Sequence, residues 1–166
     1  MKKIFLFGFI SLCFVSKNHA QDWISFNSTE GKFSAMLPYE PGQQTDSSKT
    51  YPVYITKMFI SRSGTDIFAI GWVDYETAYT FDAQKELEAN RDNFIKGINS
   101  TLIESKNIEF NGYKGLEFSA QGGGVFWTSK VFIVGKRPYQ LVAGSTTGKA
   151  SENENKFYNS FSIKND

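Results

Sequence analysis

The only cysteine of the 166-residue sequence, Cys13, and its only histidine, His19, both lie among the first twenty residues. If those residues are removed as a leader, the remaining chain has neither a thiol nor an imidazole. Such a chain folds without a disulfide, so packing alone must hold it together. A Ser-His-Asp triad, a cysteine nucleophile and a His/Cys zinc site are excluded on the same ground.

The first twenty residues have the pattern of a secretory signal peptide. A positive start at residues 1–3 precedes an apolar run from Ile4 to Val15, and the small Ala20 ends a short polar stretch. The run is too short for a membrane-spanning helix, which takes about 20 residues. Lipid attachment at Cys13 is disfavoured because the preceding Leu12 is bulky. We expect cleavage near Ala20 and export to the periplasm or the medium.

The remaining residues, 21–166, are expected to form a single domain. Losing Lys2, Lys3 and Lys17 leaves 15 of the 18 basic residues against 17 acidic ones, a net charge of about −2. Scattered charges of both signs argue against nucleic-acid binding, and no later apolar run is long enough to cross a membrane. Twelve Phe, eight Tyr and three Trp remain to fill a core.

Alternating apolar residues predict strands in the first half of the domain. Short strands are expected at 23–26 and 32–37, and longer ones at 53–60 and 66–75. The last of these has apolar residues on both faces, which is typical of a central strand covered on both sides. Between the two pairs, the polar stretch 42–50 is interpreted as a surface loop.

A helix and further strands are predicted in the second half. Apolar residues three and four apart predict a helix over about 83–99, with Asp82 as its N-cap. Asn111-Gly112 indicates a tight hairpin turn. Ser151 and Glu154 fit a capping box at the start of a short last helix.

The strands flanking the hairpin turn are expected at 107–110 and 113–119, and a second pair at 125–134 and 139–143. Because hairpins require antiparallel pairing, we expect an α+β domain, an antiparallel β-sheet flanked by helices.

Four segments resemble bacterial PsbP-like domains. They are Phe26–Ser34 with Pro38 and Pro41, Phe110–Phe118, Val131–Leu141 and Lys156–Phe161. The resemblance implies an α/β/α sandwich, the fold of photosystem II PsbP, of periplasmic DcrB-like proteins and of a Ran-binding nuclear transport factor. Characterised relatives mostly bind other proteins, so the resemblance implies a non-catalytic accessory factor and supplies no catalytic residue or cofactor.

A ligand or partner site is predicted at Gly122, Gly123 and Gly124, with Trp127 just beyond them. Glycines lack a Cβ, so a ligand can approach their backbone closely. A mobile hairpin tip is the alternative interpretation of the same run.

A metal site is predicted at Asp74 and Glu76, which alternate near a strand end. With a further acid such as Asp66 or Asp82, their oxygens would suit Ca²⁺. The same carboxylates could instead act as the acid/base pair of a carboxylate-based hydrolase, or form only a solvated acidic edge.

The tryptophans and several tyrosines are the last candidates. Three tryptophans (Trp23, Trp72, Trp127) and four tyrosines (Tyr51, Tyr54, Tyr75, Tyr79) form either an aromatic binding platform or core packing.

Of three functions, we favour an exported protein that binds another envelope or secreted protein. The alternatives are a small-ligand or Ca²⁺-binding protein and a carboxylate-based hydrolase.

Overall fold

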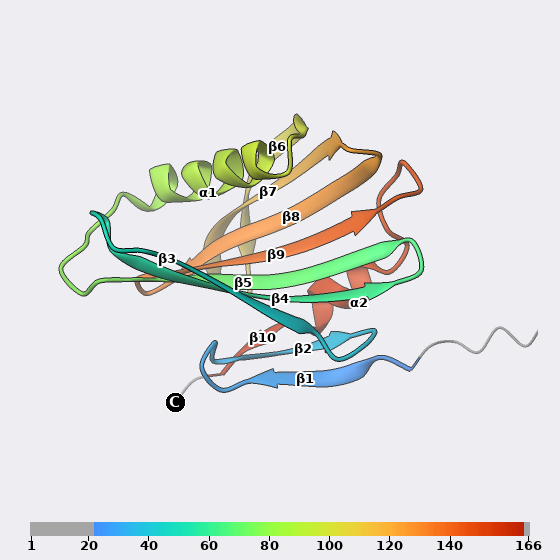
Figure 1. The fold of residues 1–166 in the computed structure, drawn as a ribbon, viewed down its shortest axis with the longest axis horizontal. Coiled ribbons are helices and arrows are strands. Elements are labelled where there is room, and N and C mark those ends of the chain that lie inside the picture. Colours follow the sequence, from blue (N-terminus) through green and yellow to red (C-terminus); the bar gives the residue numbers. More distant parts are fainter. Residues whose placement is uncertain (1–21, 165–166) are drawn as a thin grey trace, which may run out of the picture.

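A computed structural model describes residues 22–164, and the expected leader with Cys13 and His19 lies outside the described residues. The elements form three layers (Figure 1). One helix lies on one face of a large sheet, and a small sheet with a second helix covers the other face. The predicted α+β class, an antiparallel sheet flanked by helices, is confirmed.

The large sheet has seven antiparallel strands in the order β3-β4-β5-β9-β8-β7-β6. Their bounds are β3 Gly42–Ser48, β4 Tyr54–Ser63, β5 Asp66–Tyr75, β6 Thr101–Phe110, β7 Tyr113–Gly122, β8 Val125–Val134 and β9 Arg137–Ser145. The predicted bounds of β5 and β8 are confirmed, and β5 is central, between β4 and β9. The Asn111-Gly112 turn is also confirmed, because both residues have a positive φ, 51° and 81°.

The interpretation of residues 42–50 as a loop is wrong. Residues 42–48 form β3, which pairs with β4 over its whole length and forms one edge of the large sheet. No side chain of β3 is buried. An edge strand with both faces wet has no apolar alternation, so its sequence is as polar as that of a loop.

The lower core lies between the large sheet and the small layer. The small sheet consists of β1 Ile24–Ser28, β2 Phe33–Leu37 and β10 Ser162–Ile163, and α2 Glu154–Ser160 lies beside it. Alternate residues of the large sheet face this layer, and they meet its rings in a buried cluster that includes Phe33, Phe68, Trp72, Phe132, Phe157 and Phe161. Packing of aromatic rings therefore replaces a disulfide here.

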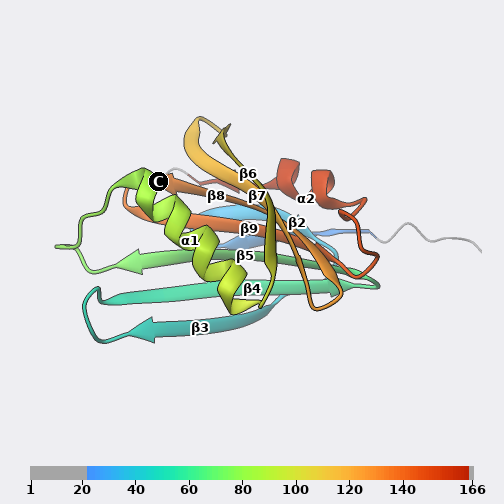
Figure 2. The same cartoon turned by 90° about the horizontal axis from the view of Figure 1, so that it is seen from above.

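The upper core lies beneath α1 Ala83–Gly97 and is smaller. Leu87 packs on Leu116, Phe118 and Val131, with Phe94 at the margin of the cluster. The helix lies obliquely across the sheet (Figure 2) and contacts β7 and β8. The predicted cap is confirmed, because the Asp82 carboxylate accepts a hydrogen bond from the Lys85 N–H at 2.9 Å.

The predicted capping box at α2 is wrong. The N-cap residue is Asn153, and its side chain makes no cap hydrogen bond. Ser151 donates instead to Asp66 at 2.8 Å, and Glu154 accepts from Thr128 at 2.7 Å. Both partners lie on the large sheet. Ser151 Oγ still accepts the Asn153 N–H at 3.1 Å, but Glu154 is turned toward the sheet and the reciprocal pair is not formed.

Candidate functional site

A groove of about 580 Å³ lies between α1 and the neighbouring face of the large sheet. Its walls come from β4, β5, β9 and α1, and from the chain on either side of them. Because α1 packs on β7 and β8, the same face of β4 and β5 is left open beside the helix. Gly71 of β5 lines the groove and has no side chain to fill it.

Four tyrosines gather at one end of this groove, which we call the tyrosine groove. Tyr54 of β4 lies opposite Tyr75 of β5 in the sheet register, with ring centroids 6.2 Å apart. Tyr79 follows β5 and packs on Tyr75 at 4.6 Å, and Tyr51 packs on Tyr79 at 5.7 Å. Tyr51 is 78% exposed, so the rings run from the groove wall out to the solvent.

The polar centre of the tyrosine groove is Glu86, in the first turn of α1. An acidic side chain is favoured there by the helix dipole. Its Oε1 accepts hydrogen bonds from the Tyr75 hydroxyl at 2.6 Å and from Asn90 Nδ2 at 2.8 Å. Burial, and then this bond to Glu86, raise the pKa of Tyr75 far above its ordinary value, so the hydroxyl stays a donor.

The sequence analysis missed Glu86 and Asn90. They lie four residues apart in α1, so they share one face of the helix. Asn90 also donates to the Glu86 backbone carbonyl at 2.8 Å, which fixes its side chain against the helix. The spacing was a usable signal, but nothing in the sequence shows that this face meets Tyr75.

Of the predicted aromatic platform, the structure brings the tyrosines together but not the tryptophans. Trp72 is buried in the lower core. Trp23 packs on Phe68 at the margin of that core, with ring centroids 5.0 Å apart. Trp127 faces α1 and packs on Phe94 at 5.9 Å. Two tryptophans therefore belong to the lower core and one lies beneath α1, and none of them joins the four tyrosines in a platform.

The predicted glycine site lies at the turn between β7 and β8. Gly123 and Gly124 have positive φ values of 59° and 76°, as a tight turn requires. A Cβ on Gly122 would come within 2.3 Å of Ser100 Oγ, so this glycine permits a close approach of two segments. Gly144 likewise permits a close approach, because a Cβ there would collide with the Trp127 ring. Binding of a ligand or partner here stays a prediction.

The predicted metal residues differ in their surroundings. Arg137 holds the Asp74 carboxylate with two hydrogen bonds, 2.6 Å from Nε and 3.0 Å from Nη2. Glu76 follows the end of β5, and its backbone N–H donates to Val53. Within residues 22–164, no group of three or more His, Cys, Asp and Glu side chains is arranged to hold a metal ion. Calcium binding stays a prediction.

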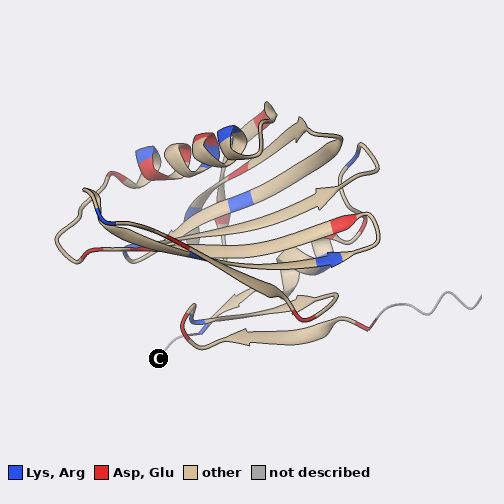
Figure 3. Cartoon of the chain, in the orientation of Figure 1, with Lys and Arg blue, Asp and Glu red and all other residues tan. Residues whose placement is uncertain are grey.

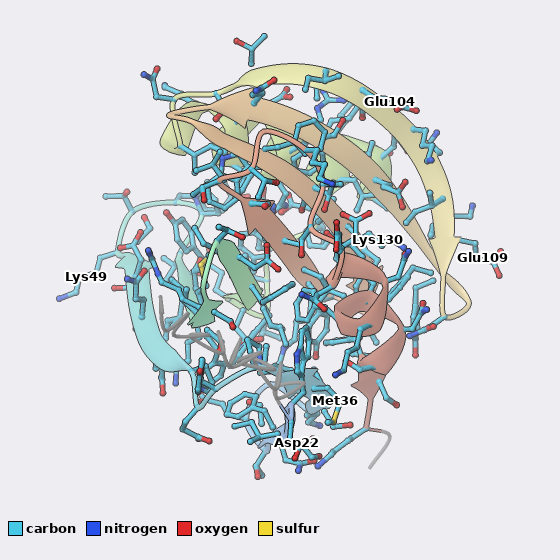
Figure 4. The ribbon with its side chains drawn as sticks, turned by 90° about the vertical axis from the view of Figure 1, so that its right-hand side faces the viewer. Asp22, Met36, Lys49, Glu104, Glu109 and Lys130 are labelled. Carbon is cyan, nitrogen blue, oxygen red and sulfur yellow. The ribbon has the colours of Figure 1, made fainter. Side chains whose placement is uncertain are left out.

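A second hollow, of about 310 Å³, lies on the other face of the sheet beside α2. Lys130, labelled in Figure 4, points into this side of the molecule, where its Nζ lies 3.4 Å from Glu117 and over the ring of Tyr158. Burial acts to raise the pKa of Glu117, but Lys106 and Lys130 outweigh it and hold the pKa below its usual value. Glu117 is thus already paired with two lysines, and the hydrolase interpretation stays a prediction.

Charges of both signs are spread over the helices and strands (Figure 3). Neither helix in residues 22–164 has the length and hydropathy needed to span a membrane.

The chain forms a three-layer α+β domain. One helix lies on one face of the antiparallel sheet, and a second helix and a small sheet lie on the other. Its fold is PsbP-like. The solution structure of cyanobacterial PsbP from Synechocystis matches it with a TM-score of 0.52 and 10% sequence identity, over 89% of this chain and 95% of that one. The resemblance predicted from the sequence is therefore confirmed at the level of the fold.

A crystal structure of a Bacteroides thetaiotaomicron protein matches with a TM-score of 0.42 and 14% identity. That match covers 86% of this chain but only 48% of the other, so this chain spans about half of that protein's length. No family model matches the sequence, and no curated protein matches it.

Proposed function

We propose that this protein is an exported, non-catalytic PsbP-like domain that binds another envelope or secreted protein through the tyrosine groove. The observation that carries the proposal is the groove itself, in which tyrosine rings surround a nearly buried polar centre. Tyrosine is a frequent anchor of protein–protein contacts because it combines a large apolar ring with a hydroxyl. Export rests on the leader pattern of residues 1–20.

The chemistry of the groove favours binding over catalysis. Glu86 is the one charged side chain among the described residues that line it. General acid–base chemistry usually pairs an acid with a base, and the groove offers no second ionised group beside Glu86. Tyr75 remains protonated and acts as a hydrogen-bond donor to Glu86. The groove therefore has the means to hold a partner group but not to transfer protons through a turnover.

Site-specific photo-crosslinking tests this proposal. Tyr51 is replaced with p-benzoylphenylalanine, a photoreactive residue of similar shape, and intact cells are irradiated. Because Tyr51 is exposed and contacts Tyr79 at the groove, we expect one reproducible crosslinked protein, identified by mass spectrometry. The matched control is the same replacement at Tyr39, which is 56% exposed but outside the groove. No reproducible partner from position 51, or the same products from both positions, would contradict the proposal.

A further inference from the structure

One oxygen of Glu86, Oε2, has no hydrogen-bond partner among residues 22–164. The residue is only 7% exposed, and both of its side-chain hydrogen bonds reach Oε1. No donor in residues 22–164 bonds to Oε2. The protein does not fully enclose this oxygen, so it is accessible from outside. Because Glu86 lines the tyrosine groove, this second oxygen is reached from the groove.

The electrostatics of the groove favour a positive group at that oxygen. A carboxylate removed from water is costly unless a cation or several donors compensate it. No Lys or Arg is among the described residues that line the groove. Arg91, the arginine of α1, is already bonded to Asp92 and Ser105. Among residues 22–164, no positive side chain compensates Oε2, so the site is open to a cation supplied by a partner.

The aromatic rings favour the same kind of group. The rings of Tyr54, Tyr75 and Tyr79 line the same groove as Glu86, and Tyr75 and Tyr79 pack with centroids 4.6 Å apart. Aromatic rings attract cations that reach their faces. Met58 and Val73 give the groove an apolar wall, against which an alkyl stem can pack while its charged end reaches the carboxylate.

We propose that the tyrosine groove binds a lysine side chain of the partner protein, with its ammonium on Glu86 Oε2. An ammonium suits this site because it is a compact point charge. An arginine fork would seek both carboxylate oxygens, and Oε1 already accepts two hydrogen bonds. This inference rests on the proposed function, and it adds the chemical group that the groove recognises.

Capped peptides test the inference on the unaltered protein. The ¹⁵N-labelled protein is titrated with a capped Gly-Lys-Gly peptide and, in parallel, with its acetyl-lysine and arginine counterparts. We expect amide shifts at Tyr75, Glu86 and Asn90 with the lysine peptide. The acetyl-lysine peptide should bind roughly tenfold more weakly, because it loses the charge-assisted bond. The arginine peptide should also bind more weakly, because Oε1 already accepts two hydrogen bonds and its fork cannot engage both oxygens. Equal affinities for the lysine and acetyl-lysine peptides, or for the lysine and arginine peptides, would overturn the assignment.

A matched pair of variants locates the contact. Glu86→Gln keeps the shape of the side chain and removes its charge, so we expect roughly a tenfold loss of affinity for the lysine peptide. Glu88→Gln removes a charge from the same helix, where Glu88 bonds only to Gln84, and should leave the affinity unchanged. Unchanged affinity in a folded Glu86→Gln variant overturns the inference. If Tyr51 still crosslinks a partner in that case, the proposed function stands without it.

Discussion

At the residue scale, Gly144 is the position where a single methyl group should matter most. A Cβ there would lie 2.5 Å and 2.6 Å from two carbons of the Trp127 ring, which is closer than van der Waals contact allows. We expect Gly144→Ala to lower the free energy of unfolding by about 1–3 kcal/mol, the usual cost of overpacking a well-filled site. Urea denaturation measures the change.

The matched control is Gly42→Ala. Gly42 also lies in a strand of the large sheet, but no atom stands within 4 Å of the position its Cβ would take. A change within about 0.5 kcal/mol is expected there. If Gly144→Ala changes the free energy of unfolding as little as Gly42→Ala, the Trp127 ring moves aside without cost. In that case the close packing of Trp127 on Gly144 does not contribute to stability.

Tyr75 makes stability depend on pH in the alkaline range. Burial and the bond to Glu86 raise its folded-state pKa above the unfolded value of 10.0, so above that pH the unfolded chain loses this proton more readily than the folded one. The stabilisation is therefore complete below pH 10 and is lost as the pH rises further. Because Tyr75 is only half-buried, we expect a slope well below the limit of about 1.4 kcal/mol per pH unit.

The variant Tyr75→Phe isolates this effect. Its free energy of unfolding, measured in urea at about pH 9 and about pH 11, should fall less between the two pH values than that of the unaltered protein. Tyr158, whose pKa burial also raises, is present in both proteins and cancels in the comparison. Equal losses in the two proteins would show that the folded state does not raise the pKa of Tyr75.

At the scale of elements, α1 depends on a cap at the end that forms the groove. The Asp82 side chain accepts a hydrogen bond from the Lys85 N–H at 2.9 Å. Glu86, which bonds to Tyr75, follows Lys85 in the same first turn of the helix. We expect Asp82→Ala to destabilise the protein by about 1 kcal/mol. It should also lower the affinity for the lysine peptide, because the first turn of α1 carries Glu86. Thermal denaturation and the peptide titration measure the two effects.

The control for this change is Asp82→Asn, which keeps a side-chain oxygen for the cap. It should retain most of the stability, since asparagine caps about as well as aspartate. Both variants lose the same charge, so a difference between them belongs to the capping bond. Equal destabilisation would instead assign the effect to charge.

How far the sequence predicts an element depends on how much of its environment is local. β5 was predicted with its observed bounds because apolar residues on both faces mark a covered strand, and β8 because it precedes a turn predicted at residues 135–138. β3 was missed because an exposed edge strand is as polar as a loop. The capping box failed because Glu154 meets Thr128, 26 residues away, and no local pattern shows this contact.

The same limit applies to the candidate site. The sequence suggested that Tyr51, Tyr54, Tyr75 and Tyr79 could act together, and the β4–β5 register does bring them together. Nothing in the sequence separates them from the tryptophans, of which Trp23 and Trp72 belong to the lower core and Trp127 packs beneath α1. Glu86 was missed because its role depends on where α1 crosses the sheet, and packing between layers decides that.

At the scale of the whole molecule, one sheet supplies both cores. In β8, Phe132 packs in the lower core and its neighbour Val131 in the upper core, since successive side chains of a strand face opposite ways. Loss of either core therefore exposes one face of the same strands. The tyrosine groove lies on this shared sheet, so its shape depends on both layers.

This sharing predicts that the domain unfolds in one cooperative transition. Leu87→Ala removes a side chain that is 2% exposed from the upper core, and Phe33→Ala removes one that is 0% exposed from the lower core. We expect losses of about 2–5 and about 3–5 kcal/mol. Each variant should keep a single urea transition, seen alike by tryptophan fluorescence and by far-ultraviolet circular dichroism.

The tryptophans make this test specific, because Trp72 reports on the lower core and Trp127 on the side beneath α1. Tyr39→Ala, at a 56% exposed position, is the control and should change the stability by no more than about 0.5 kcal/mol. Fluorescence and circular dichroism midpoints that separate in Leu87→Ala but not in Phe33→Ala would mean that α1 detaches while the sheet and the lower layer stay folded. The groove wall would then be a mobile element on a stable sheet, and partner binding would have to include the free energy of ordering it.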